Sequence, residues 1–187
     1  MGKIAIFFPG IGYHNDKPLL YYSRKIAKEA GYELLNVEYH DISVEVKGNP
    51  SELARAAVEA YNQTVSFLKD TDFPQYDQVL FVGKSIGTII ASRYARDFGI
   101  KAEMIWYTPL EATYDFPSVN TISFIGTKDP FSDVQRIRNL SAETGIKLHV
   151  YEGANHSLET ENTLQNLEYI TDVMIKTKDF IERKSNV

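Results

Sequence analysis

Residues 78–98 of this 187-residue chain read QVLFVGKSIGTIIASRYARDF. Residues 78–82 are expected to form a strand, because the four residues after Gln78 are an apolar run, and from Ile86 onward apolar residues recur with helical spacing. A Gly-x-Ser-x-Gly pattern at 83–87 joins the two segments, with Gly83 and Gly87 flanking Ser85. Where a strand turns sharply into a helix, a serine at positive φ needs neighbours without a Cβ. The pattern therefore predicts Ser85 to be a nucleophile exposed at the end of a strand.

Strand-length apolar runs and helix-period segments alternate along the rest of the chain. We expect the other strands at 3–8, 33–39, 103–107, 121–125 and 147–151, and the other helices from Asp16, at 51–69, from Ser132 and at 163–182. This alternation predicts an α/β fold, a three-layer α/β/α sandwich around a six-stranded, mostly parallel sheet. We find no linker or repeat, so one domain is expected to cover residues 1–187.

Residues at the expected helix ends fit this assignment. Asp16 and Ser132 are suitable caps for two helix starts, and Gly31 and Gly145 are placed to end those helices. In the last helix we expect a row of apolar residues to face the core. The row consists of Leu164, Leu167, Ile170, Met174 and Ile181.

An acid and a base follow two later strands, so that Ser85, Asp129 and His156 occur in this order along the chain. Asp129 comes just after the fifth strand in IGTKDPF, and His156 just after the sixth in EGANHSLE. The carboxyl ends of parallel strands share one rim, so both side chains can meet Ser85 there. We expect Ser85 as nucleophile, His156 as general base and Asp129 as the acid that orients the histidine. Asp129 could instead be a simple turn former before Pro130.

These motifs give the chain a clear resemblance to the α/β-hydrolase superfamily, carried by GKSIG, GTKDP and GANHS and extending from Ile4 to the last helix. The resemblance implies the strand order 2-1-3-4-5-6, without the first two strands of larger members. About a dozen residues separate strands four and five, where larger relatives often insert a lid, so a minimal, lidless form is implied. Some relatives carry their acid after strand four, which makes Glu111 and Asp115 the alternatives to Asp129.

The resemblance also locates an oxyanion hole. Where the family usually has His-Gly after the corresponding first strand, this chain has Pro9-Gly10, followed by Ile11. We expect the backbone N–H groups of Ile86 and Ile11 to stabilise a developing oxyanion, since such donors are typically worth about 3 kcal/mol each. The Ile86 amide would also begin a helix, where the partial positive charge favours an anion.

A substrate pocket is expected along the same rim. The residues assigned to it are Tyr13, His14, Tyr107 and Phe131. Ordinary packing is the alternative role for its aromatic residues.

Composition excludes several other classes of protein. A net charge of -5 and a pI near 5.4 argue against nucleic acid as a partner. No apolar run is long enough to span a membrane, and we read no signal peptide. The absence of cysteine fits a cytoplasmic location. No metal motif is present, and two nucleotide-binding patterns are incomplete because Gln78 and Asn15 occupy required glycine positions.

The sequence thus predicts a cytoplasmic serine hydrolase that needs no cofactor and cleaves an ester or thioester of a small-molecule acyl substrate. Two alternatives stay open. One is a non-catalytic binding protein with the same fold, and the other is acyl transfer to an acceptor other than water. The sequence makes no prediction of oligomeric state.

Overall fold

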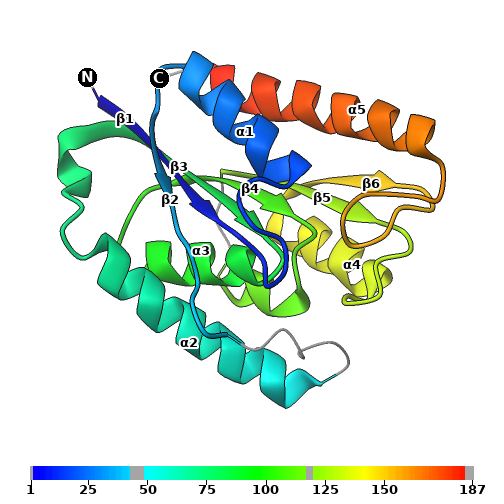
Figure 1. The fold of residues 1–187 in the computed structure, drawn as a ribbon, viewed down its shortest axis with the longest axis horizontal. Helices are drawn as coiled ribbons and strands as arrows, with labels where there is room; N and C mark the ends of the chain where they lie inside the picture. The colour runs from blue at the N-terminus through cyan, green and yellow to red at the C-terminus, as the bar shows by residue number, and fades with distance from the viewer. Residues whose placement is uncertain (1, 43–48, 117–119, 184–187) are drawn as a thin grey trace.

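A computed structural model describes residues 2–42, 49–116 and 120–183. Its centre is a sheet of six strands in the order β2-β1-β3-β4-β5-β6, and every neighbouring pair is parallel (Figure 1). The strands are β1 (Gly2–Phe8), β2 (Glu33–Asn36), β3 (Tyr76–Lys84), β4 (Glu103–Tyr107), β5 (Thr121–Gly126) and β6 (Lys147–Tyr151). The predicted fold class and strand order are confirmed, although β2 ends three residues earlier than expected.

Helices cover both faces of the sheet. Figure 1 shows α1 and α5 on one face and α2, α3 and α4 on the other. Their bounds are α1 (Pro18–Glu29), α2 (Pro50–Leu68), α3 (Ile86–Asp97), α4 (Val134–Thr144) and α5 (Thr163–Glu182). Short 3-10 turns precede β3 and follow β4, at η1 (Phe73–Gln75) and η2 (Glu111–Asp115). Within the described ranges, no helix is both long enough and apolar enough to cross a bilayer.

The apolar core consists of two layers, one on each face of the sheet. Along β1, Ile4, Ile6 and Phe8 pack toward α2 and α3, whereas Ala5 and Phe7 pack toward α1 and α5. All five are buried. Successive side chains of a strand point to opposite faces, so a parallel strand covered on both sides must be apolar throughout. This explains why the strand runs lack polar alternation.

Both predicted helix caps are wrong. Helix α1 begins after Lys17 without a side-chain cap, and Asp16 instead forms an ion pair with Arg24 at 2.7 Å. At the start of α4 the cap is Asp133, whose carboxylate accepts the N–H of Arg136 at 3.0 Å. Ser132 lies one residue too early and donates to the Pro109 carbonyl. Adjacent residues can satisfy the same orphan N–H groups, which sequence spacing alone does not separate.

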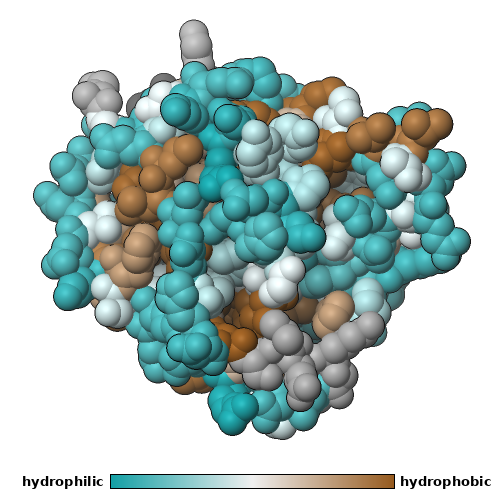
Figure 2. All heavy atoms as spheres, viewed as in Figure 1, coloured by the Kyte–Doolittle hydropathy of each residue, from teal (hydrophilic) through white to brown (hydrophobic). Residues whose placement is uncertain are grey.

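The bounds of α5 are as predicted, but its first two apolar residues do not face the core. Leu164 and Leu167 are 72% and 58% exposed, whereas Ile181 is buried. The first turns of α5 extend past α1, which packs beside the later turns (Figure 1). Figure 2 shows apolar side chains at the surface over the start of α5. The buried residues of α5 are Val173, Thr177, Phe180 and Ile181, so the row predicted from the sequence is wrong in its first two members.

Candidate active site

Ser85 lies on a strained turn between β3 and α3. Its backbone has φ 56° and ψ −124°, a conformation that residues with a Cβ seldom adopt. The turn is fixed by hydrogen bonds from the Ser85 N–H to the Tyr107 carbonyl at 2.9 Å and from the Thr88 N–H to the Ser85 carbonyl at 2.9 Å. The serine thus has the conformation predicted from its flanking glycines.

Close backbone packing explains those glycines. A Cβ on Gly87 would lie 2.6 Å from the Pro9 carbonyl oxygen and closer still to that of Phe8. A Cβ on Gly83 would lie 2.7 Å from the Cα of Thr88. Since the atoms in the way belong to the backbone, rotation of a side chain cannot relieve the clash. The missing Cβ atoms allow α3 to begin directly against β1 and β3.

Backbone strain gathers at the carboxyl ends of the strands. Thr108 and Leu158 share the positive φ of Ser85, at 46° and 58°. Thr108 follows β4 directly, and Leu158 lies in the loop after β6. Such conformations cost about 1–3 kcal/mol each and concentrate at functional sites. The rim predicted to hold the chemistry is therefore also where the chain is strained.

Asp129 and His156 meet at this rim. The Oδ2 atom of Asp129 lies 2.7 Å from the Nδ1 atom of His156. The carboxylate side chain has no exposed surface, and its Oδ1 atom accepts the N–H of Phe131 at 2.9 Å. An ionised carboxylate is an acceptor, so His156 donates from Nδ1 and carries its lone pair on Nε2. The imidazole is thereby fixed in one tautomer.

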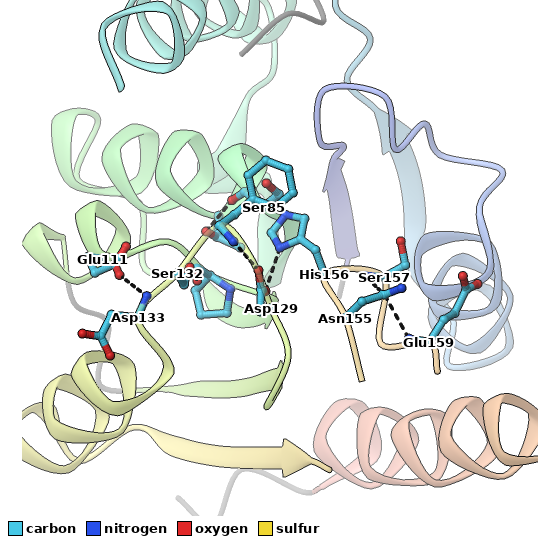
Figure 3. Close-up of polar contacts among 12 residues, drawn as sticks. Ser85, Glu111, Asp129, Ser132, Asp133, Asn155, His156, Ser157 and Glu159 are labelled. Carbon is cyan, nitrogen blue, oxygen red and sulfur yellow. Dashed lines mark hydrogen bonds and ion pairs between the residues drawn. The ribbon is translucent and has the colours of Figure 1, made fainter. Parts of the chain in front are cut away.

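Ser85 lies beside this pair. Figure 3 shows the His156 imidazole between the Asp129 carboxylate and Ser85. Among residues 2–42, 49–116 and 120–183, no hydrogen bond joins the Ser85 hydroxyl to the imidazole. Such a bond often forms only once substrate is bound, and rotation about the Cα–Cβ bond of serine changes where its hydroxyl lies. The structure therefore brings the three predicted side chains to one rim with the acid–base contact already made.

The loops that carry the acid and the histidine are tied to each other. The Lys128 N–H donates to the Ala154 carbonyl at 2.9 Å, and the Gly153 N–H donates to the Thr127 hydroxyl at 2.8 Å. A Cβ on Gly126 would lie 2.5 Å from the carbonyl carbon of Ala154. This close approach was not predicted. Its sequence signal is the glycine that ends β5 immediately before the acid loop.

The loop after β1 presses against Ser85. Gly10 and Tyr13 exchange two backbone hydrogen bonds, at 3.1 and 3.2 Å, across a tight turn that has Ile11 and Gly12 at its tip. A Cβ on Gly10 would lie 3.3 Å from the Cβ of Ser85. Within the described ranges, neither the Ile11 nor the Ile86 N–H donates a hydrogen bond to the protein. Both predicted oxyanion donors therefore lie on segments that border Ser85.

Of the four predicted pocket residues, Phe131 and His14 lie beside the histidine or the Ile11 turn, whereas Tyr13 and Tyr107 point inward. The Phe131 ring packs 4.6 Å from that of His156, and His14 is exposed and lines a cavity of about 430 Å³ beside the Ile11 turn. Tyr13 points inward and accepts the Leu19 N–H at 3.1 Å. The side chain of Tyr107 points away from the rim.

Tyr107 lies in the core under α1 and α5. Its hydroxyl is 2.8 Å from that of Ser23 and 2.6 Å from that of Thr177, and it has no exposed surface. The placement of Tyr107 in the substrate pocket is therefore corrected. The residue ends β4 beside the rim, but strand alternation turns its side chain toward the helices.

The alternative acids have other surroundings. Glu111 accepts the N–H of Asp133 at 2.6 Å and so supports the start of α4 (Figure 3). Asp115 is exposed. Among the described residues, the His156 imidazole makes its acid contact with Asp129, and no group of three histidine, aspartate or glutamate side chains could hold a metal ion.

Electrostatics at the rim favour a neutral imidazole. Burial lowers the pKa of His156, and the nearby charge of Lys84 lowers it further, while the hydrogen bond to Asp129 opposes both effects. Burial also lowers the pKa of Lys84 to about 7, again against the attraction of Asp129. An unprotonated Nε2 can accept a proton, so the site is suited to general base chemistry.

Comparison with known proteins relates the chain to one family and to several solved structures. A family model of an alpha/beta hydrolase domain matches residues 3–182. Three solved structures align with 94–97% of the chain, and the last percentage given for each is the share of its own length that is covered. They are an alpha-beta serine hydrolase homologue from Coxiella burnetii (TM-score 0.61, 13% identity, 83%), the esterase Pf2001 from Pyrococcus furiosus (0.64, 13%, 82%) and Est1E from Butyrivibrio proteoclasticus with bound ferulic acid (0.62, 14%, 89%). At these identities the similarity shows a shared fold. No curated protein matches the sequence.

Proposed function

The chain belongs to the alpha/beta hydrolase domain family, and on that premise we propose that it is a serine hydrolase of carboxylic esters or thioesters. The observation that carries this proposal is the contact between Asp129 and His156. A fully buried carboxylate holds Nδ1 at 2.7 Å, which leaves Nε2 unprotonated on an imidazole beside Ser85. A base oriented in this way can activate a hydroxyl.

The reaction has two steps. Ser85 Oγ attacks the acyl carbon while its proton passes to Nε2 of His156. That proton then moves to the leaving alcohol or thiol as its bond to the acyl carbon breaks, which leaves an acyl ester on Ser85. Water attacks this ester and gives a proton to His156, which returns it to Ser85 Oγ as the carboxylic acid departs. Asp129 holds the ring and stabilises the imidazolium in both steps.

The N–H groups of Ile86 and Ile11 are the proposed oxyanion donors. The Ile86 amide begins α3, where the helix dipole favours a negative charge. The Ile11 amide sits at the tip of the turn that borders Ser85. Donors held by the backbone need no reorganisation when the oxyanion forms, which is why they lower the barrier effectively.

The substrate we propose has a small to moderate acyl group. Phe131 beside His156 offers an apolar surface, and His14 lines the cavity of about 430 Å³ next to the Ile11 turn. The lack of cysteine in the chain fits a reducing compartment such as the cytoplasm. We propose no cofactor, because each proton in the two steps is accounted for by His156.

Intact-mass analysis after treatment with a fluorophosphonate probe tests the proposal. The wild-type protein is expected to gain one probe adduct and to hydrolyse short-chain p-nitrophenyl esters, and Ser85→Ala is expected to lose both properties. Ser157→Ala is the matched control, since Ser157 lies in the histidine loop beside His156 and should label like the wild type. Labelling that persists in Ser85→Ala would contradict the assignment of the nucleophile.

Product analysis separates the remaining alternatives. Hydrolysis in the presence of added alcohols should release the free acid, whereas an acyltransferase would release a new ester. A wild-type protein that neither labels nor turns over any ester or thioester would identify a binding protein that shares the fold.

A further inference from the structure

Both backbone polar groups of Ser85 are tied to the segment that ends β4 and continues into η2. The Ser85 N–H donates to the Tyr107 carbonyl at 2.9 Å. The Ser85 carbonyl accepts two hydrogen bonds from Thr88, one from its N–H at 2.9 Å and one from its hydroxyl at 2.6 Å. The Thr88 hydroxyl lies 2.7 Å from the hydroxyl of Thr113 in η2. The N–H of Ser85 is thus held directly by residues 107–113, and its carbonyl is held through Thr88.

The direction of the hydrogen bonds between the two threonines and Ser85 follows from the donors available. A carbonyl oxygen can only accept, so the one hydroxyl proton of Thr88 is donated to Ser85. The Thr113 hydroxyl must then donate its own proton to Thr88 Oγ1. Thr88 and Thr113 have no exposed surface, so water does not compete for these groups. The hydrogen bonds therefore run in one direction, from η2 through α3 to the nucleophile.

The segment after β4 also holds the loop that carries Asp129. The Ser132 hydroxyl donates to the Pro109 carbonyl at 3.0 Å. The Asp133 N–H donates to the Glu111 carboxylate at 2.6 Å (Figure 3). Both donors lie shortly after Asp129 in the chain. One short segment is therefore bonded to the turn of the proposed nucleophile and to the loop of its acid.

We propose that Thr113 is a positioning residue that acts on Ser85 through Thr88. A serine at φ 56° is strained, and such a conformation persists only where the surrounding structure over-determines it. With its N–H and its carbonyl both held, Ser85 cannot relax toward an ordinary backbone conformation without breaking a buried hydrogen bond. The two threonines thus keep the nucleophile raised at the rim beside His156.

Isosteric substitutions test this role by removing one hydroxyl at a time. Valine has nearly the shape of threonine without its hydroxyl, whereas serine keeps the hydroxyl. We would compare Thr88→Val, Thr113→Val and the double valine variant with the conservative variants Thr88→Ser and Thr113→Ser. Thr64→Val is the matched control, because the buried Thr64 hydroxyl donates to the Ala60 carbonyl at 2.9 Å within α2, a helix that carries no residue of the site.

The hold on Ser85 can be measured without any substrate. Amide hydrogen exchange by NMR reports how often the N–H groups of residues 85 and 88 leave their acceptors. Relative to intrinsic rates, both amides should exchange about three- to tenfold faster in Thr88→Val and Thr113→Val, since each substitution removes one buried hydrogen bond. The two serine variants and Thr64→Val should match the wild type at these amides. Thr113→Val keeps the bond from Thr88 to Ser85 and decides the question alone if Thr88→Val does not fold.

The kinetic part of the inference rests on the proposed hydrolase function. Thr88→Val should lower kcat about tenfold with KM nearly unchanged, the loss expected for a displacement of about 0.5 Å where 1 Å costs about 10²-fold. The double valine variant separates positioning from packing. Removing both hydroxyls leaves neither without a partner, so its free energy of unfolding should recover relative to Thr88→Val. Its kcat should stay as low as in Thr88→Val, because the Ser85 carbonyl still lacks the hydroxyl donor.

Three results would overturn the inference. The first is wild-type exchange at residues 85 and 88 in both single valine variants. The second is a kcat that recovers together with stability in the double variant, which would make the two threonines a packing contact only. The third is an equal effect of Thr64→Val on the same amides. Faster exchange in the valine variants of a protein that hydrolyses no ester would instead reject the hydrolase proposal and leave the hold on Ser85 intact.

Discussion

Replacing Gly126 by alanine tests whether the tie between the acid and histidine loops positions the chemistry. The added Cβ would lie 2.5 Å from the Ala154 carbonyl carbon and 2.8 Å from the Asn155 carbonyl oxygen. Separations under 3.0 Å essentially do not occur for real Cβ atoms, so the two loops must part by about 0.5 Å or more. Asp129 and His156 lie three and two residues from the clashing positions and would move with them.

The expected loss follows from that displacement. A misplacement of about 1 Å can cost about 10²-fold in rate, so a shift of half that size predicts a loss of about tenfold or more in kcat/KM. Overpacking should lower the free energy of unfolding by about 1–3 kcal/mol. We would measure ester hydrolysis and urea unfolding on the same preparations. Hydrolysis would be assayed without denaturant, where the variant is folded.

Gly153→Ala is the matched control. Gly153 lies in the histidine loop with φ 70° and has no atom within 4 Å of an added Cβ. This substitution should cost about 1–2 kcal/mol of stability for the left-handed backbone without pushing the loops apart, so kcat/KM should stay near the wild-type value. Wild-type kcat/KM in a folded Gly126→Ala protein would refute the reasoning, since the loops would then part without consequence for the acid–base contact.

Two further substitutions test the acid and the corrected position of the tyrosine. Asp129→Asn should lower kcat by about 10³–10⁴-fold in steady-state assays while the fold is kept by circular dichroism, because an amide no longer fixes the His156 tautomer; a loss below tenfold would point to another acid. Tyr107→Phe should lower the free energy of unfolding by about 1–3 kcal/mol in urea, because the buried hydroxyls of Ser23 and Thr177 lose a partner. Its kcat/KM should be unchanged, and a large rise in KM would return Tyr107 to the substrate pocket.

Much of the fold could be predicted from the sequence because its signals are local. Apolar runs of four to eight residues and helical spacing locate the elements, and β4, β6 and α5 begin and end where they were predicted. The turn at Ser85 was equally predictable, because the flanking glycines indicate a sharp turn in which Ser85 has a positive φ. The order of Ser85, Asp129 and His156 along the chain predicted that they share one rim, and Asp129 and His156 are in contact there.

The remaining features depend on neighbours that spacing does not reveal. The exposure of Leu164 depends on how far α1 extends along α5. The orientation of Tyr107 depends on which face of the sheet its side chain lies on. The burial of Lys84 is the clearest case, since lysine is expected at the surface unless it is paired. Gly126 was overlooked because a close approach of two loops has no periodic signal.

The glycines around Ser85 also limit how this chain can vary. At Gly83 the obstacle to a side chain is the main chain of α3, and at Gly87 it is the main chain at the end of β1, which are common to every sequence that keeps this crossing. Compensating changes elsewhere cannot create room there, in contrast to a crowded core position where a neighbour can be trimmed. A mutagenesis library for new substrates should keep these two glycines and vary positions such as His14 and Phe131.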